Sequence, residues 1–401
     1  MAPPSDRPIL RLKPKADARR IRHGHPWAWS DELVLDRRAR AIPPGSIAVL
    51  QDADRRDLGC GVATVSAPIG LRILDTDPHA EIDRAWLDAR VAAALSLRDR
   101  VYDAPFYRLI HAEGDDLPGL IVDRFDDTLV VQPNAVWLED RLDALVEALI
   151  AATGATRIVK NGTGRARAAE GLPGGVAILR GPALQQPLTV PMNGALYQAD
   201  VIGGQKTGLF FDQRPNHAFA ARLAGGARVL DVFSHVGGFG LSALGAGAAS
   251  VTAIDTSEAA LTLARAGAAA MGVADRLDTV AEDAFDGMHR LAGEGAVFDL
   301  VIADPPAFAP SKPALTQGLR AYERVARLAA PLVAPGGTLV LCSCSHAADL
   351  SRFRAACLRG IGRAGRVPRL IHTGFAGPDH PQHPALSETG YLKALFFRLR
   401  P

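Results

Sequence analysis

One pattern dominates the second half of the chain: short apolar runs alternate with longer amphipathic stretches. The apolar runs have the length of strands that are buried on both faces, and the amphipathic stretches have the length of helices. The expected strands span residues 228–233, 250–255, 277–281, 298–303, 338–342 and 391–399. The expected helices span residues 239–244, 258–271, 283–291, 315–332 and 349–361. This alternation predicts a mostly parallel sheet with helices on both faces, which is a Rossmann-like α/β fold.

The first half of the chain shows two other patterns. Short apolar runs between turns predict a small β domain, and they span residues 9–12, 46–51, 59–65 and 71–74. A mixed α+β segment follows, with expected helices at 83–100 and 138–152 and strands at 107–111, 120–123, 128–132 and 157–160. Because single domains usually hold ~100–200 residues, the 401 residues should form two or three domains. We therefore expect domains at 1–77, 78–187 and 188–401.

The composition is typical of a soluble globular protein, with 48% hydrophobic and 22% charged residues. The four cysteines are too few and too unevenly spaced for a disulfide framework, and no Cys-X-X-Cys pair indicates a metal site. The first residues show no secretory signal. Residues 232–254 lack Asp, Glu, Lys and Arg, but their glycines favour a strand, a turn, a helix and a second strand over a membrane span. We therefore expect a cytoplasmic protein without a metal ion or a membrane segment.

The net charge is only +2, but basic residues are clustered in two places. Residues 1–40 hold ten Lys and Arg against five Asp and Glu, and residues 349–379 hold six arginines. Local basic segments on a nearly neutral protein fit a partner with a phosphate backbone. Solvated helix faces would give the same pattern, so charge alone leaves both interpretations open.

Glycines and carboxylates follow the ends of the expected strands, where ligands bind in sheets of this kind. The first strand leads into a glycine-rich turn at 231–240, and the second ends at Asp255. A carboxylate at that place can accept both hydroxyls of an adenosine ribose. Asp283 follows the third strand, where it could bond an adenine amino group. The fourth strand ends at 304–308, Asp-Pro-Pro-Ala-Phe, whose prolines stop the strand and form a rigid wall.

The glycine turn alone does not define the ligand. Residues 238–243 also satisfy the GxGxxA pattern of NAD-binding folds, and glycines can equally serve only to make a tight turn. The four strand ends carry fitting residues in the correct order. Together they favour a cofactor that contains adenosine.

Several strings along nearly the whole chain resemble a known family. They are Arg19-Arg20 with His25-Pro26-Trp27, and residues 113–123, 203–214, 231–240, 304–308, 343–346 (Ser-Cys-Ser-His) and 379–381. The most specific is 203–214, Gly-Gly-Gln-Lys-Thr-Gly-Leu-Phe-Phe-Asp-Gln-Arg. The family is that of the PUA-domain class I S-adenosylmethionine (SAM)-dependent methyltransferases acting on ribosomal RNA, the large-subunit rRNA methyltransferase I-like enzymes that make 5-methylcytosine.

The resemblance implies a PUA-like RNA-binding domain, a middle α+β domain and a class I methyltransferase domain. It implies SAM as the cofactor and RNA, ribosomal RNA foremost, as the partner; a homodimer is left open. The residues that would hold SAM are Phe210, Gln213, Arg214, Phe233, Ser234, Gly237, Gly238, Asp255, Asp283 and Asp304. Those on the RNA side would be Arg19, Arg20, Trp27 and His346.

The resemblance also implies that Cys344 is the nucleophile. Asp304 is the best candidate for orienting the amino edge of the cytosine or for relaying its protons. Attack of a thiolate on carbon 6 of cytosine activates carbon 5 for methylation. Cys344 follows the fifth strand, at the edge where this chemistry belongs, whereas Cys342 within the strand is expected to be packing. Two departures from the family concern the target-base side. Glu-Arg-Val-Ala-Arg follows Tyr322 where the family usually has a Lys and an Asn, and Ala347 replaces a frequent His.

Three alternatives remain at the level of sequence. Asp304-Pro-Pro-Ala-Phe resembles the string with which amino-methyltransferases hold an exocyclic amine, and that chemistry needs no cysteine. An NAD-dependent oxidoreductase would explain the glycine turn and Asp255, but not residues 304–308 or 343–346. A non-catalytic RNA-binding protein would fit a Cys344 that is buried in the core.

Overall fold

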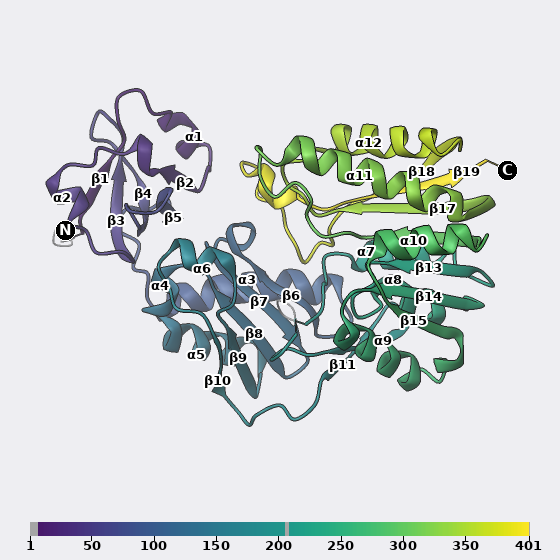
Figure 1. Cartoon of the computed structure of the whole chain (residues 1–401). Helices are drawn as coiled ribbons and strands as arrows, with labels where there is room; N and C mark the ends of the chain where they lie inside the picture. Colours follow the sequence, from purple (N-terminus) through teal and green to yellow (C-terminus); the bar gives the residue numbers. More distant parts are fainter. Residues whose placement is uncertain (1–6, 205–207, 401) are drawn as a thin grey trace. The chain divides into compact units, whose positions relative to one another are not determined.

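The computed structural model describes residues 7–204 and 208–400 (Figure 1). The chain forms two compact units. Unit 1 contains the residues up to Leu184 together with Pro378–Leu386, and unit 2 contains Gln185–Gly377 together with the residues from Ser387 onward. The three domain boundaries expected from the sequence remain a prediction, and the placement of Pro378–Leu386 in unit 1 was not expected.

Unit 1 begins with a five-stranded sheet of order β1-β3-β4-β5-β2. Its strands are β1 (Ile9–Arg11), β2 (Trp27–Trp29), β3 (Ser46–Gln51), β4 (Asp57–Ala63) and β5 (Ile69–Asp75). Two short helices, α1 (Ala18–Arg22) and α2 (Arg37–Arg40), lie in the connections. Leu10, Ala28, Leu50 and Leu71 meet in its core. The sequence pattern missed β2 because three residues, Trp-Ala-Trp, are too few to show an alternation.

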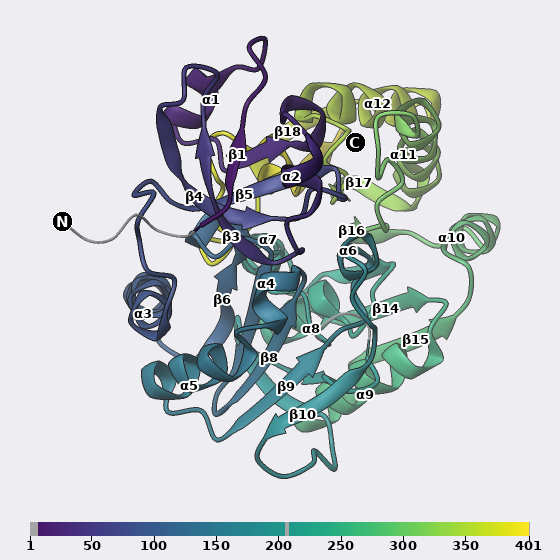
Figure 2. The same ribbon diagram turned by 90° about the vertical axis from the view of Figure 1, so that its left-hand side faces the viewer.

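The second sheet of unit 1 has the order β10-β9-β8-β7-β6. Its strands are β6 (Phe106–His111), β7 (Leu120–Phe125), β8 (Thr128–Pro133), β9 (Arg157–Asn161) and β10 (Val176–Arg180). Helices α3 (Arg84–Val101) and α5 (Leu142–Thr153) pack together against it (Figure 2). The single helix expected at 138–152 is wrong, since α4 (Val136–Glu139) is separate. The buried Trp137 fixes this turn by donating its indole N–H to Pro118 O.

Unit 2 is built on a seven-stranded sheet of order β15-β14-β13-β16-β17-β19-β18. The strands are β13 (Arg228–Val232), β14 (Ser250–Asp255), β15 (Leu277–Ala281), β16 (Phe298–Ala303), β17 (Val333–Ser343), β18 (Pro368–Gly374) and β19 (Lys393–Leu399). The first five are parallel, and β19 runs antiparallel between β17 and β18. β14 and β15 lie on one side of β13, and β16 and β17 lie on the other. The strand order therefore reverses at β13, and ligands are expected in the crevice beside this strand.

Helices cover both faces of this sheet. One face carries α10 (Ala284–Gly293), α11 (Leu315–Ala329) and α12 (Leu350–Arg363), whose apolar side chains meet those of the strands in one core. The other face carries α7 (Arg214–Ala221), α8 (Gly238–Gly245), α9 (Glu258–Ala270) and the hairpin β11 (Leu188–Met192)–β12 (Ala195–Ala199). The predicted Rossmann-like architecture is confirmed. Residues 232–254 form the turn, helix and strand expected of them, and no helix of the described ranges is long and apolar enough to cross a membrane.

Candidate active site at the carboxyl edge of the unit 2 sheet

The turn between β13 and α8 has an unusual backbone. Phe233, His235 and Gly237 have positive φ angles of 62°, 50° and 81°. This conformation is strained for the two residues with side chains, and such strain is concentrated at functional sites. The turn is fixed because Ser234 N donates to Ile254 O (3.1 Å) and Gly237 N donates to Ser234 O (2.8 Å). The backbone of Phe233–Gly238, which the sequence assigned to SAM, is therefore preformed.

Asp255 ends β14 beside this turn. Its Oδ2 accepts from His235 N and its Oδ1 accepts from Ser257 N, both at 2.9 Å. The carboxylate is half-buried and belongs to the last residue of the strand, as the sequence predicted. Each carboxylate oxygen has a second lone pair, so Asp255 can hold the turn and still accept hydroxyl groups of a ribose.

Asp231 is a further carboxylate that the sequence analysis did not assign to the site. It is almost fully buried, and its Oδ2 accepts from Gly240 N at 2.8 Å. A Cβ on Gly240 would lie 2.9 Å from Val251 Cγ1 and 3.2 Å from Asp231 Oδ2, so only glycine fits there. Burial, and to a smaller extent the charge of Asp255, raises the pKa of Asp231 to about 7.

The segment that precedes α7 also reaches this edge. The Phe210 ring lies 5.0 Å from the His235 ring, and Gln213 Nε2 donates to Asp304 Oδ2 at 2.9 Å. Gln213 Oε1 in turn accepts from the buried Asn216 Nδ2 at 2.7 Å. Arg214 begins α7. Gln205, Lys206 and Thr207 of the predicted string 203–214 lie outside the described residues.

Aromatic rings line the ends of β13 and β16. Phe233 lies 6.2 Å from Phe285 and 6.5 Å from Phe308, measured between ring centroids. Phe308 also contacts Tyr322 at 5.0 Å, and the Arg324 guanidinium lies 4.3 Å from the centre of the Phe285 ring. The sequence missed Phe285 because it belongs to α10 rather than to a strand end. The rings form an apolar wall suited to a flat heterocycle.

Asp283 and Asp304 follow β15 and β16 as predicted. Asp283 Oδ1 caps α10 by accepting from Phe285 N and Asp286 N at 2.8 and 3.2 Å. Asp304 is half-buried, and its backbone N–H donates to Val232 O at 3.2 Å, which places it beside the end of β13. The structure thus brings Asp255 and Asp304 to the strand ends on either side of the Phe233–Gly237 turn.

The Ser-Cys-Ser-His string lies at the end of β17, the strand next to β16. Ser343 Oγ donates to Tyr322 Oη at 2.9 Å, and Tyr322 Oη is 2.7 Å from Ser345 Oγ. Ser345 Oγ also accepts from Ala309 N at 2.9 Å. Both serines are buried, and the Cys344 between them is half-buried. The two serines therefore anchor the turn, a role that the sequence missed because Tyr322 is distant in the chain.

The other cysteines of the chain are buried. Burial raises the pKa of Cys342 well above its ordinary value, and the nearby Asp304 charge adds to this rise. Burial likewise raises the pKa of Cys60 and of Cys357. A buried thiol that resists ionisation is a poor nucleophile, so Cys344 is the cysteine best suited to chemistry. His346 follows it and is exposed.

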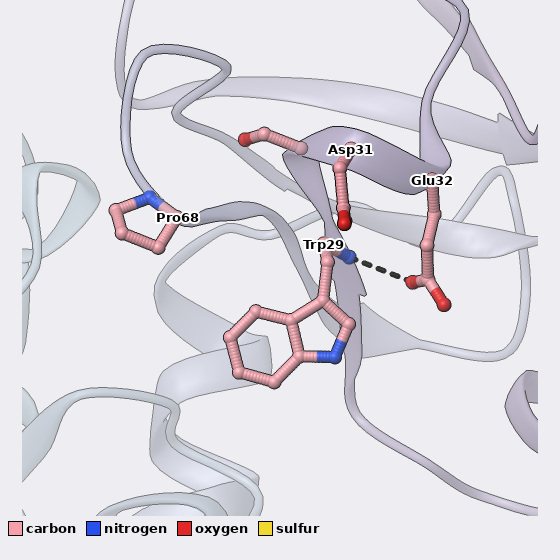
Figure 3. A pocket seen from close by; sticks show the side chains of 5 residues that line it. Trp29, Asp31, Glu32 and Pro68 are labelled. Atoms are coloured by element: carbon pink, nitrogen blue, oxygen red, sulfur yellow. Dashed lines mark hydrogen bonds between the residues drawn. The ribbon is translucent and has the colours of Figure 1, made fainter. Parts of the chain in front are cut away.

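The residues predicted to contact RNA in unit 1 have different surroundings. Arg19 is exposed, whereas Arg20 Nη2 donates to both carboxylate oxygens of Glu32 at 2.6 and 2.8 Å. Trp27 donates its indole N–H to Glu113 Oε1 at 2.9 Å. A shallow pocket beside it is lined by Trp29, Ser30, Asp31, Glu32 and Pro68 (Figure 3).

The arginines of the stretch 349–379, which all lie in unit 2, are less available to a phosphate backbone than the composition suggests. Arg359 Nε lies 3.0 Å from Glu323 Oε2, and Arg363 pairs with the other oxygen of the same carboxylate. Arg366 Nη1 donates to Ala330 O and Val333 O at 3.1 and 2.7 Å. These three arginines join α12 and the residues after it to the α11 side of the sheet.

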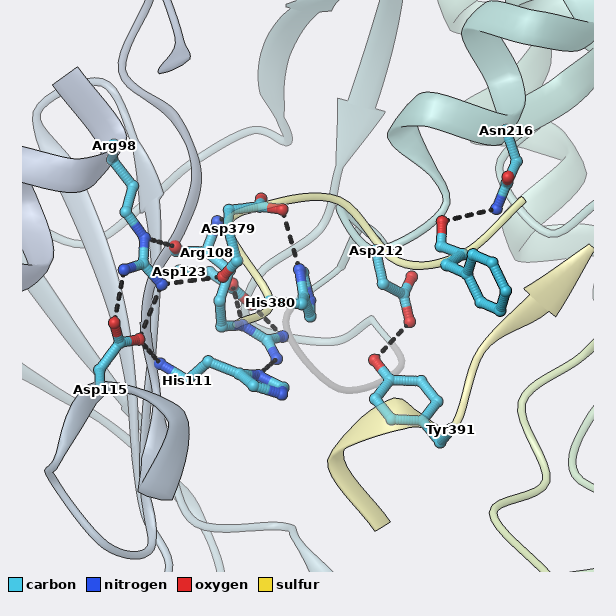
Figure 4. A network of polar contacts seen from close by, with 11 residues as sticks. Arg98, Arg108, His111, Asp115, Asp123, Asp212, Asn216, Asp379, His380 and Tyr391 are labelled. Carbon is cyan, nitrogen blue, oxygen red and sulfur yellow. Dashed lines mark hydrogen bonds and ion pairs between the residues drawn. The ribbon is translucent and has the colours of Figure 1, made fainter. Parts of the chain in front are cut away.

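A dense polar network around Arg98 and Arg108, drawn in Figure 4 together with contacts of unit 2 residues, lies in unit 1. Arg98 is buried and makes two hydrogen bonds to Asp115, at 2.6 and 2.7 Å, and a third to Asp379 O at 2.9 Å. Arg108 pairs with Asp123 at 2.6 Å and donates its backbone N–H to Asp379 Oδ2 at 3.1 Å. The Asp-His-Pro string at 379–381 therefore holds the segment Pro378–Leu386 in unit 1.

The site fits an adenosine-containing sulfonium cofactor. Among the residues that the structure describes, Ser234 Oγ and Asp231 Oδ1 are buried without a hydrogen-bond partner. Both atoms belong to the β13 end and its turn, where a ligand or a water molecule can satisfy them. Asp255 offers acceptors for the ribose, and the rings of Phe233, Phe285 and Phe308 offer an apolar surface for the base.

Comparisons with known proteins agree with this geometry. Residues 140–398 match the family described as S-adenosylmethionine-dependent methyltransferase, and residues 10–76 match the PUA-like domain. The chain is 35% identical to the "Ribosomal RNA large subunit methyltransferase" of Deinococcus radiodurans, with 99% of each chain covered. It is 34% identical to the "Ribosomal RNA large subunit methyltransferase I" of Shewanella amazonensis, with 97% of this chain and 99% of that one covered.

Solved structures share the fold. A Streptococcus mutans protein, described as a candidate SAM-dependent methyltransferase, superimposes with a TM-score of 0.81 at 17% identity, covering 98% of this chain and 100% of that one. A methyltransferase structure in complex with S-adenosylhomocysteine gives a TM-score of 0.82, also at 17% identity, with 98% and 99% covered. The chain therefore belongs to the family of S-adenosylmethionine-dependent methyltransferases, and it carries a PUA-like domain ahead of the methyltransferase fold.

Proposed function

We propose that this protein transfers a methyl group from SAM to carbon 5 of a cytosine in large-subunit ribosomal RNA, with Cys344 as a covalent nucleophile. The substrate class is supported by the two relatives above, which are named for large-subunit ribosomal RNA and align over nearly their whole length. The choice of carbon 5 rests on one observation. Cys344 is the half-buried cysteine, and it lies between two anchored serines at the strand end beside that of Asp304.

The proposed chemistry follows from the weakness of carbon 5 as a nucleophile. The Cys344 thiolate adds to carbon 6 of the cytosine, which forms a sulfur–carbon bond and makes carbon 5 electron-rich. SAM, when bound, would supply the electrophilic methyl group to carbon 5 and would be left as S-adenosylhomocysteine. Loss of the carbon 5 proton to a base then expels the thiolate and restores the ring. Asp304 orients the amino edge of the cytosine, and Asp255 with the Phe233–Gly238 turn holds the cofactor.

In this proposal RNA recognition belongs to the PUA-like domain, residues 1–77, and residues 78–187 connect it to the methyltransferase domain, residues 188–401. The exposed Arg19 and His346 are available to phosphate or base edges. Arg20 and Trp27 act indirectly, because their donors are bonded to Glu32 and Glu113. Their part is to fix the shape of the RNA-binding surface.

The decisive test compares two cysteine variants. Cys344→Ala is expected to keep the fold and the affinity for S-adenosylhomocysteine but to lose methyl transfer to ribosomal RNA. Cys342→Ala, the matched control two residues earlier in the chain, is expected to retain activity apart from a packing defect. Transfer of a radioactive methyl group from SAM to large-subunit ribosomal RNA measures both.

A trapping experiment tests the covalent step directly. RNA transcribed with 5-fluorocytidine carries a fluorine that cannot leave as a proton, so the wild-type enzyme should remain bonded to it after denaturing electrophoresis. Cys344→Ala should give no adduct. Absence of an adduct with the wild type, together with active Cys344→Ala, would replace this proposal by methylation of an exocyclic amine held at Asp304-Pro305-Pro306.

A further inference from the structure

Lys393 is a buried cation close to the Cys344 turn. It begins β19 and is paired in register with Ser343 of β17, the residue before Cys344. Only 3% of its surface is exposed. Burying an ammonium group is costly unless partners compensate for the lost water, so a lysine at this place requires an explanation.

The ammonium group of Lys393 binds the turn that carries Cys344. Its Nζ donates to Ser345 O and to Ala348 O, both at 2.7 Å. These carbonyls lie on either side of His346 and Ala347, directly before Asp349, the residue that caps α12. One cation therefore holds both ends of the segment between Cys344 and the helix.

The charged groups around this turn come from several elements. Burial lowers the pKa of Lys393 to about 8, whereas the negative charges of Cys344 and of Asp349 act to raise it. Tyr322 of α11 also faces Cys344, but burial raises its pKa to about 12, so it stays neutral. The Cys342 thiol is also kept neutral by burial, with Asp304 of the neighbouring strand beside it. Lys393 is thus a positive group whose charge is coupled to that of Cys344.

Coupling between two charges is reciprocal. Since a Cys344 thiolate favours the protonated form of Lys393, the protonated lysine favours the thiolate by the same free energy. We propose that Lys393 is a positioning residue that fixes the Cys344 turn through two backbone carbonyls and supplies the positive charge that keeps Cys344 ionised. This inference rests on the proposed covalent mechanism for its purpose, but its charge effect can be measured without RNA.

The test measures alkylation of Cys344 by iodoacetamide between pH 6 and 10, with the modified cysteine identified by mass spectrometry. In the wild-type full-length protein Cys344 should ionise below the ordinary cysteine pKa of ~8.5. Lys393→Met keeps the length of the side chain but removes the charge, and it should shift the alkylation midpoint upward by about one pH unit or more, a roughly tenfold slower reaction at pH 7. Lys393→Arg, which keeps the charge, should restore most of the rate.

The controls separate this role from misfolding and from the proposed function. Unchanged affinity for S-adenosylhomocysteine and unreactive Cys60, Cys342 and Cys357 show that a variant is folded. A folded Lys393→Met protein with the wild-type alkylation profile would overturn the inference. If that variant does not fold, a wild-type midpoint at or above ~8.5 would overturn it equally. The two proposals can also fail separately. If Lys393→Met shifts the alkylation profile but Cys344→Ala still methylates RNA, the charge effect is supported and the covalent mechanism is refuted.

Discussion

Three of the carboxylates at the carboxyl edge of the unit 2 sheet, Asp255, Asp304 and Asp231, differ in their surroundings. Asp255 is half-buried and accepts hydrogen bonds from two backbone N–H groups. Asp304 is held by the Gln213 amide. Asp231 is buried with one backbone donor, and its pKa is raised to about 7. The protonation of Asp231 therefore changes near neutral pH.

The raised pKa of Asp231 makes the stability of the protein depend on pH. Between its ordinary value of 3.8 and its folded value of about 7, the folded state binds more protons than the unfolded state. The resulting stabilisation is fully present below pH ~4 and is lost as the pH rises toward ~7, with a slope of up to about 1.4 kcal/mol per pH unit. Asp231→Asn should remove this contribution.

The measurement is urea unfolding of the wild type and of Asp231→Asn at several pH values. The difference between the two free energies of unfolding should shift in favour of the variant from pH 4 to pH 7 and stay constant above it. Asp278→Asn, an exposed residue of β15, serves as the control and should show no such trend. Parallel pH profiles for the wild type and Asp231→Asn would refute a raised pKa.

At the scale of elements, helices α11 and α12 pack unusually closely. A Cβ on Gly360 of α12 would collide with Glu323 O and lie 2.7 Å from Ala326 Cβ and 3.0 Å from Arg327 N, all on α11. Glu323 pairs with Arg359 and Arg363 across the same contact. Glu323, the residue after Tyr322, therefore binds α11 to the neighbouring helix. α11 also carries Tyr322, so this contact supports the Cys344 turn.

Two glycine substitutions in α12 test the importance of this contact. Gly360→Ala should destabilise the protein by about 1–3 kcal/mol, because the added methyl group must separate the two helices. Gly362→Ala meets no atom within 4 Å and should stabilise the helix by about 0.5–1 kcal/mol. Thermal unfolding of both variants measures the difference. Equal effects of the two changes would mean that the helices can move apart without cost.

Periodicity predicted the elements of the unit 2 sheet well. The bounds expected for β14, β15 and β16 are the observed ones. The apolar residues of the central strand β16 are buried, as the pattern of a parallel strand predicts, whereas β15 lies at the edge of the sheet and is partly exposed. β18 was not predicted, because it is a largely exposed strand and its sequence shows no apolar run. The hairpin β11–β12 was missed as well.

The sequence predicted only those site residues that lie at or directly after the end of a strand. Asp255, Asp283 and Asp304 occur where the sequence placed them, although their roles remain proposals. Tyr322 and Lys393 could not have been found in the same way, because each acts on the Cys344 turn from a distant part of the chain. Such contacts form only when the sheet is folded, and the spacing of residues along the sequence does not indicate them.

At the scale of the whole molecule, the chain passes between the two units at three places: after Leu184, after Gly377 and after Leu386. Residues 181–187 have no helix or strand and are mostly exposed, so they should accept a protease cleavage sequence between Gln185 and Gln186. After cleavage the two fragments should still co-elute in gel filtration, because Pro378–Leu386 stays held in unit 1 by Arg98 and Arg108.

Denaturant should separate the fragments, and it should do so at a lower urea concentration in the Asp379→Ala variant, which lacks the carboxylate bonded to Arg108 N. The uncut Asp379→Ala protein serves as the control for overall stability. Fragments that separate immediately in native buffer would show that the segment Pro378–Leu386 contributes little to holding the two fragments together.

The same connectivity limits how this protein can exchange parts with its relatives. Nine residues that follow β18 in the chain, Pro378–Leu386, complete unit 1, and among them Asp379 bonds to the buried Arg98 and to the backbone of Arg108. A hybrid that joins unit 1 of one relative to unit 2 of another at residue 184 would pair a foreign segment with Arg98 and Arg108. Recombination between homologues should therefore succeed only when residues 378–386 are inherited together with the N-terminal unit, so that two distant stretches of the gene evolve as one module.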